Sequence, residues 1–178
     1  ATPVSAQTVL ISLAPHQLIS DPRLDALARK ADQAQSVKQA VEGDLAPIPQ
    51  TKFPPWHHQL QGFHLLKTQP ATMPAWSMGC GKSKTVVDFV CNTPEIRKTL
   101  IVCPKSVINV WEEEFEKHAA SPVCLTPLAT GSTSKRAKMA KQQMELAQVR
   151  RDKLVLAINY DAIWRGDLSE YFLSQEWD

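Results

Sequence analysis

The chain has 178 residues, of which 43% are hydrophobic and 21% charged, and this composition is typical of a globular domain with one substantial core. Its formal net charge of +2 is too small to identify a nucleic-acid-binding protein, because such binding depends on local clusters of cations. No apolar run approaches the roughly 20 residues that cross a bilayer, and no signal-peptide pattern is present, so we expect a cytoplasmic or nuclear protein with no membrane partner.

The cysteine pattern excludes a zinc ribbon and a secreted disulfide scaffold. The four cysteines lie far apart and without C-x-x-C spacing, so we expect reduced thiols in an intracellular protein. These cysteines are Cys80, Cys91, Cys103 and Cys124.

The first 52 residues are expected to form an extension of the main domain. Thr8 to Leu13 is a short β-branched and apolar run that predicts a strand. Asp21 as N-cap and a stripe of apolar residues predict a helix from Pro22 to Val41. Prolines crowd the segment Leu45 to Pro55, which therefore reads as a linker before a domain over 53–178.

From Trp56 onward, helical and strand patterns alternate, which predicts an α/β fold with a mainly parallel sheet covered by helices on both faces. The expected helices are Trp56 to Leu66, Ser83 to Cys91, Val107 to His118 and Ser134 to Arg150, and the expected strands are Thr99 to Cys103, Val123 to Leu125 and Lys153 to Ile158.

A glycine-rich loop, Met78-Gly79-Cys80-Gly81-Lys82-Ser83, carries the groups that a nucleotide's phosphates require. Glycines let backbone N–H groups converge on phosphate oxygens, and the following helix N-terminus adds partial positive charge. Lys82 is expected to reach the β- and γ-phosphates and Ser83 to ligate Mg²⁺. The strict G-x-x-x-x-G-K-[ST] pattern is not met, because Trp76 stands at the position of the first glycine.

Three segments resemble motifs of the Snf family of superfamily 2 helicase-like DNA translocases, which includes chromatin remodellers and related phage and bacterial proteins. His57 to Phe63 is similar to the family's P-Y-Q-x-x-G motif. Ala75 to Ser83 looks like A-D-E-M-G-L-G-K-T, with Trp76 and Ser77 in place of the two acids and Cys80 in place of leucine. Thr99 to Ser106, followed by an N-x-W-x-x-E-F helix, resembles motif Ia.

The resemblance implies a RecA-like first lobe, over about Phe53 to Asp178, with ATP and Mg²⁺ as cofactors. It makes Lys82 the catalytic lysine, and it gives Gln59 contact with the adenine edge. Double-stranded DNA, held through its backbone, and a C-terminal RecA-like lobe are the implied partners. The implied nucleotide-binding residues are Gln59, Trp76, Ser77, Met78, Gly79, Cys80, Gly81, Lys82 and Ser83, with Ser83 at the nucleotide's Mg²⁺, and the implied DNA contacts are Pro104, Lys105 and Ser106.

The family's Asp-Glu-x-His motif, whose acids hold Mg²⁺ and position the attacking water, is absent from this sequence. The sequence ends at Glu176-Trp177-Asp178, where the resemblance places the start of that strand. We therefore expect the 178-residue chain to bind nucleotide weakly and not to hydrolyse it.

Two other functions stay open. A small-molecule kinase would need an acidic acceptor site, for which Asp88 and Asp161 are the candidates. A scaffold that binds DNA or protein without catalysis would be favoured if nucleotide binding did not depend on Lys82.

Further sequence features have both a functional and a structural interpretation. Trp56, one helical turn before Gln59, is suited to stacking on adenine or to packing. The three histidines His57, His58 and His64 lack a nearby acid or cysteine that would complete a metal site. Basic residues between Lys135 and Lys153 form either a stripe along a phosphate backbone or a solvated helix face: Lys135, Arg136, Lys138, Lys141, Arg150, Arg151 and Lys153.

Overall fold

The computed structural model describes residues 22–178. The expected strand Thr8 to Leu13 and the expected N-cap Asp21 lie outside these residues. No helix among the described residues is long and apolar enough to cross a membrane.

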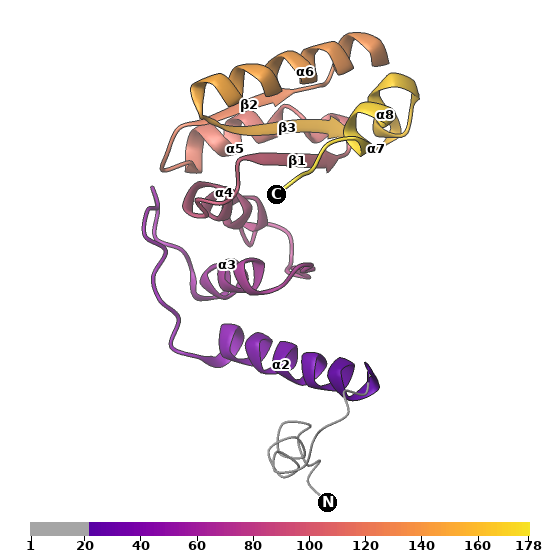
Figure 1. Cartoon of the computed structure of the whole chain (residues 1–178). Helices are drawn as coiled ribbons and strands as arrows, with labels where there is room; N and C mark the ends of the chain where they lie inside the picture. The colour runs from indigo at the N-terminus through magenta and orange to yellow at the C-terminus, as the bar shows by residue number, and fades with distance from the viewer. Residues whose placement is uncertain (1–21) are drawn as a thin grey trace, which may run out of the picture.

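A three-stranded parallel sheet forms the centre of the fold (Figure 1). Strands β1 (Lys98–Cys103), β2 (Val123–Pro127) and β3 (Lys153–Asn159) lie in the order β1-β3-β2. Every residue of β3 after its first is buried, because this strand has a neighbour on each side and helices on each face. The expected parallel α/β fold is confirmed.

Helices cover both faces of the sheet. Val155 and Ala157 of β3 pack into a core with α4 (Lys82–Asn92) and α5 (Val110–His118). Residues of β3 that alternate with them, such as Leu156, pack on the opposite face. The helices there are α6 (Thr133–Arg150), α7 (Tyr160–Ile163) and α8 (Gly166–Leu173). This alternation follows from the two-residue period of a β-strand.

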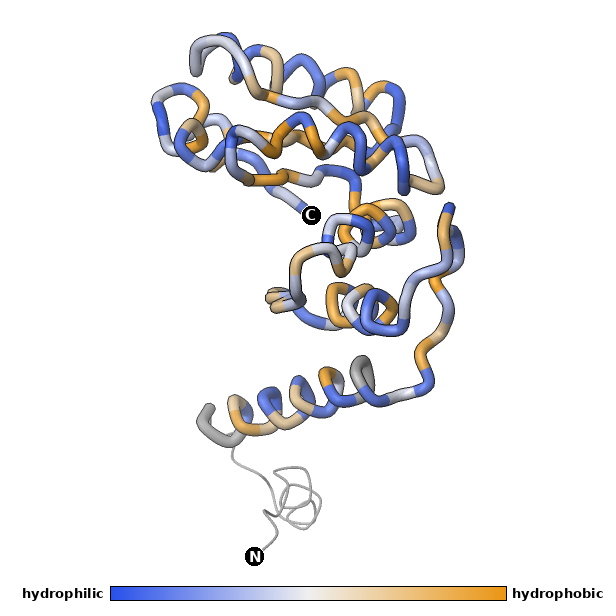
Figure 2. Tube along the Cα trace, turned by 180° about the vertical axis from the view of Figure 1, so that it is seen from behind, coloured by the Kyte–Doolittle hydropathy of each residue, from blue (hydrophilic) through white to orange (hydrophobic). Residues whose placement is uncertain are grey.

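Two more helices extend the fold on the α4 side of the sheet (Figure 1). Helix α3 (His57–Thr68) packs on α4, and the rings of Phe63 and Phe89 meet edge to face with centroids 6.1 Å apart. Helix α2 (Pro22–Glu42) packs in turn on α3. In Figure 2 the apolar stretches of the sheet and of α4 lie next to one another, whereas α2 alternates between polar and apolar residues.

The proline-rich segment between α2 and α3 forms no helix or strand, yet it is attached to the domain. The Gln50 N–H donates to the Asn92 side chain at 2.9 Å, and the Asn92 amide donates back to the Gln50 carbonyl at 2.8 Å. Lys52 donates to the Glu116 carbonyl at 2.6 Å, and Ile48 is buried. The segment therefore lies across the ends of α4 and α5 and is hydrogen-bonded to both helices.

Two expectations about helices differ from the structure. The single helix expected from Val107 to His118 is divided into a 3-10 turn, η1 (Lys105–Val107), and α5, and fully buried Ile108 lies between them. Helices α7 and α8 were not expected, since they are too short to show a helical period in the sequence. After α8, the Asp178 N–H donates to the Lys98 carbonyl at 3.1 Å, beside the start of β1.

Candidate nucleotide site and the carboxyl edge of the sheet

The glycine-rich loop leads directly into α4. Gly79 and Gly81 have φ angles of 79° and 75°, in the left-handed region that favours glycine, and Gly81 is the N-cap residue of α4. A Cβ on Gly81 would lie 2.3 Å from the Gln59 amide nitrogen, so a larger residue there would have to displace the Gln59 side chain. Residues 70–78, which lead into the loop, form no helix or strand.

Two carbonyl oxygens just before the loop accept hydrogen bonds from the Lys82 ammonium. It donates to the Trp76 carbonyl at 2.8 Å and to the Ser77 carbonyl at 3.0 Å. A lysine has three donors, so one stays available while the other two keep the ammonium beside the loop. Ser83 is the second residue of α4. The backbone N–H groups in this first turn have no partner within the helix, so they can donate to a ligand at the helix N-terminus.

Gln59 joins α3 to the phosphate loop. Its side chain is only 4% exposed, accepts a hydrogen bond from the Trp56 N–H at 3.0 Å, and donates to the Cys80 carbonyl at 3.1 Å. The ring of His58 lies beside it and donates from Nε2 to the same carbonyl at 2.9 Å, because a carbonyl can only accept. The structure therefore brings the expected adenine-contact residue and the loop together across 21 positions of sequence.

Aromatic rings pack behind this contact. The ring of Trp76 meets His58 edge to face at 4.9 Å, and His58 meets Trp56 at 5.7 Å. Trp76 also covers Gly62 of α3, where an added Cβ would lie 2.5 Å from the indole. Trp76 replaces an acid of the family motif, and here it fills the space above the glycine of the Q-x-x-G sequence. Sequence reasoning assigned no role to His58 or Gly62, although both belong to the glutamine motif.

A cavity of about 560 Å³ opens in front of the loop. Trp56, Gln59, Met78, Gly79 and the residues from Gly81 to Lys84 contribute to its lining, whereas Cys80, Trp76 and Ser77 do not, and Met78 is almost fully exposed. Helix α5 supplies the opposite wall with Glu114, Lys117 and His118, which sequence reasoning did not place at this site. Their approach depends on how α4 and α5 pack, which no local pattern reveals.

A buried ion pair lies directly behind the loop. Lys84 donates to Asp88 at 2.5 Å, and both side chains are at most 9% exposed. Burial raises the pKa of Asp88, although the hydrogen bond and the charge of Lys84 oppose that rise. The second carboxylate oxygen of Asp88 is buried without a hydrogen-bond partner. Asp88 is thus committed to the interior and does not line the cavity, which weighs against the kinase alternative.

His118, at the end of α5, is close enough to Lys84 and Asp88 for their charges to affect its pKa. Burial lowers the pKa of His118, and Glu114, whose carboxylate lies 4.0 Å away, partly offsets this effect. The Nδ1 atom of His118 has no partner and is buried. The neutral form of the His118 imidazole is therefore favoured on the α5 wall of the cavity.

The three residues expected to contact DNA lie together at the carboxyl edge of the sheet. Pro104, Lys105 and Ser106 follow the end of β1 and are exposed. Cys103 pairs in register with Asn159 at the end of β3, so the Asn159-Tyr160 pair lies beside this turn. The carboxyl edges of parallel strands coincide, and this brings the two motifs together.

The basic residues around α6 are divided between the two ends of the sheet. Arg136 belongs to the carboxyl edge, where it donates to the Asn159 side chain at 3.1 Å and to the Gly131 carbonyl at 3.0 Å. Arg151 and Lys153 lie at the opposite, amino end of β3. The two ends of this basic run therefore lie at opposite edges of the sheet, and the exposed Lys135, Lys138 and Lys141 lie on α6 between them.

The remaining candidate ligands have structural contacts. His64 bonds with the Ala46 carbonyl at 2.8 Å, and the four cysteines are free thiols. Asp161, the other acid considered for a kinase, is exposed on α7.

Comparison with protein families gives one match. The model of the SNF2-related domain matches residues 23–177, nearly the whole chain, and the match begins upstream of Phe53 so that it includes α2. No curated protein matches the chain significantly.

Proposed function

Because the chain belongs to the SNF2-related family, we propose that its phosphate loop binds ATP with Mg²⁺ as part of the first lobe of a DNA-dependent ATPase. Members of this family are ATP-dependent enzymes of the helicase-like superfamily 2 and generally bind DNA. The observation that carries the proposal is the position of Lys82, fixed beside two left-handed glycines at the start of α4.

The residues present fit a nucleotide's phosphates. Gly81 forms a cradle that a Cβ would fill, the N–H groups of the first turn of α4 are free to donate, and Lys82 supplies a cation. Ser83 would hold the Mg²⁺ ion, which supplies charge neutralisation between the phosphates. Gln59 and Trp56, which line the same cavity, would hold the base.

For DNA, we propose the carboxyl edge of the sheet. Exposed Lys105 and Ser106 offer an ammonium, a hydroxyl and backbone donors, which are the groups that contact a phosphate backbone. Tyr160 lies next to them and is 49% exposed. These contacts carry no base specificity, which suits a protein that moves along duplex DNA.

We also propose that the 178-residue chain alone binds ATP without turning it over. Hydrolysis needs a carboxylate that orients the attacking water, and the sequence contains no Asp-Glu-x-His motif. DNA-stimulated ATP hydrolysis by this chain, abolished by Lys82→Ala, would contradict this part of the proposal.

Replacing Lys82 by alanine is expected to weaken Mg-ATP binding by roughly 10- to 100-fold, because charge-assisted hydrogen bonds to the phosphates are lost. Isothermal titration calorimetry with a non-hydrolysable ATP analogue measures this loss. Lys141→Ala is the control, since Lys141 is an exposed lysine of α6 that does not line the cavity. Equal affinities for the Lys82 variant and the parent chain would favour the scaffold alternative.

Replacing Lys105 by alanine is expected to weaken binding to duplex DNA and to reduce the slope of log K against log salt concentration by about 0.9, the value for one lost phosphate contact. Fluorescence anisotropy at several salt concentrations gives both quantities. Lys98→Ala is the matched control, because Lys98 begins the same strand, at its amino end. A salt slope that changes equally in both variants would remove the carboxyl edge as the DNA-contact surface.

A further inference from the structure

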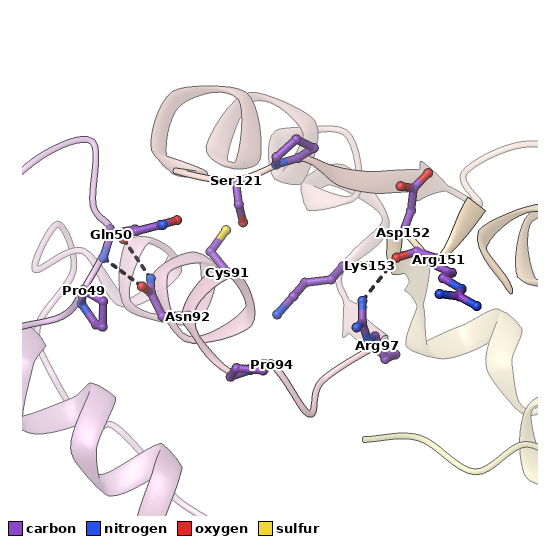
Figure 3. Close-up of a pocket in the computed structure, with 11 residues that line it drawn as sticks. Pro49, Gln50, Cys91, Asn92, Pro94, Arg97, Ser121, Arg151, Asp152 and Lys153 are labelled. Carbon is purple, nitrogen blue, oxygen red and sulfur yellow. Dashed lines mark hydrogen bonds between the residues drawn. The ribbon is translucent and has the colours of Figure 1, made fainter. Parts of the chain in front are cut away.

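A second cavity, of about 590 Å³, lies at the amino ends of the strands (Figure 3). This open cavity is lined by the end of α4, the loop before β2, the end of α6 and the docked proline-rich segment. Helix α4 starts at the phosphate loop and has 11 residues, so its two ends are about 16 Å apart. The two cavities share no lining residue.

Carbonyl oxygens anchor two cations of this cavity in place. The Lys153 ammonium donates to the Val90 carbonyl and to the Thr93 carbonyl, each at 2.6 Å, at the end of α4. Arg97 donates from one terminal nitrogen to the Arg151 carbonyl at 3.2 Å. Lysine has three donors and arginine five, so both side chains keep free donors in a fixed position. Anchored cations lose little conformational entropy on binding an anion.

The third cation, Arg151, stands at a position that normally belongs to glycine. It ends α6 with a φ of 58°, and it is the one non-glycine residue with positive φ among residues 22–178. The Asp152 N–H donates to the Ala147 carbonyl at 3.1 Å, which is the bond of a Schellman cap. The Arg151 guanidinium has no hydrogen-bond or ion-pair partner within that part of the chain. The backbone of Arg151 is thus in a strained conformation, and its guanidinium is available to bind a ligand.

The balance of charge in the cavity is positive. Asp152 is the one carboxylate in its lining, and it forms no ion pair with the three cations in the part of the chain that the structure describes. Ser121 adds a buried hydroxyl oxygen that has no partner, and its side chain faces the cavity in Figure 3. The volume lies within the ordinary range for small-molecule sites.

We propose that this cavity binds a small phosphate-bearing anion through Arg97, Arg151 and Lys153. Guanidinium groups match phosphate oxygens in a bidentate manner, and the cavity is too small for a folded partner. The site is independent of the nucleotide site, because it lies at the other end of α4 and uses different residues. Its occupant stabilises the junction of α4, β3 and α6, which these three cations connect.

The test is a titration of the whole ¹⁵N-labelled 178-residue chain, followed by ¹H–¹⁵N NMR at constant ionic strength. Inorganic phosphate and glycerol 3-phosphate are added separately, so that tighter binding of one separates the free ion from a phosphorylated small molecule. We expect saturable shifts of the amides at 91–97 and 151–153. Shifts that grow linearly without saturation, or saturable shifts confined to 79–83, would overturn the proposal.

Arg151→Gly makes the test specific. Glycine relieves the positive φ, so the variant is expected to unfold about 2–4 °C higher than the parent chain, while its affinity for the anion falls at least about fivefold, as expected for one lost charged contact. Arg97→Met removes a second cation and is expected to weaken binding in the same way. Lys141→Ala is the control, since it removes the same charge from the exposed surface of α6. Equal affinities for all three variants would show that the charges are not acting at this cavity.

Discussion

Replacing Asp88 by asparagine is expected to lower the free energy of unfolding by about 3–5 kcal/mol, because it leaves the Lys84 ammonium buried without its counter-charge. The two side chains are among the least exposed polar groups of the structure, and they lie 2.5 Å apart. Chemical denaturation with urea, followed by circular dichroism, measures the loss. The phosphate loop precedes Lys84 directly, so nucleotide binding is expected to weaken as well.

A double variant, with both Lys84 and Asp88 replaced by apolar residues, tests whether the unpaired buried charge causes the loss of stability. Lys84→Met combined with Asp88→Leu is expected to recover most of the lost stability, because no charge is left buried. Glu42→Gln is the matched control, since Lys38 and Glu42 form a pair with the same i, i+4 spacing but with side chains 73% and 65% exposed. That change is expected to cost less than about 0.5 kcal/mol. A loss for Asp88→Asn as small as that of the control would contradict the burial argument.

Replacing Gly81 by alanine is expected to destabilise the chain by about 2–4 kcal/mol, because the left-handed backbone and a steric clash both oppose a Cβ. The clash is with Gln59, whose amide nitrogen would lie 2.3 Å from the added carbon. Relief of the clash requires the Gln59 amide to leave the Cys80 carbonyl, which weakens the contact between α3 and the loop and leaves the His58 bond to that carbonyl. Nucleotide affinity is therefore expected to fall together with stability in calorimetric titrations and thermal melts.

The Gly79→Ala variant separates the cost of the left-handed backbone from the cost of the steric clash. Gly79 has nearly the same φ as Gly81, 79° against 75°, but no atom lies within 4 Å of an added Cβ. It is expected to cost only the backbone term, about 1–2 kcal/mol. If the two variants are equally destabilised, the contact between Gln59 and the loop does not constrain Gly81.

Local sequence patterns predicted most of the elements well. The helix expected from Pro22 to Val41 is found as Pro22–Glu42, and the strand expected from Lys153 to Ile158 is found as Lys153–Asn159. Apolar periodicity and capping residues act over a few positions, so they can be read from neighbours alone. The division beside Ile108 was not predicted, because the apolar spacing of this segment fits one continuous helix and does not show which side chain the tertiary core buries.

The sequence by itself determined the α/β alternation, the parallel sheet, the glycine-rich loop with Lys82 and the motifs of the SNF2-related family. Tertiary structure alone decided which distant residues meet: Gln59 with Cys80 and His118 with the charges behind the loop. It also divided the basic residues between two edges and gathered Arg97 and Lys153 in one cavity. The physical reason is that backbone conformation follows local chemistry, whereas a cavity is formed by the packing of elements that no short window of sequence contains.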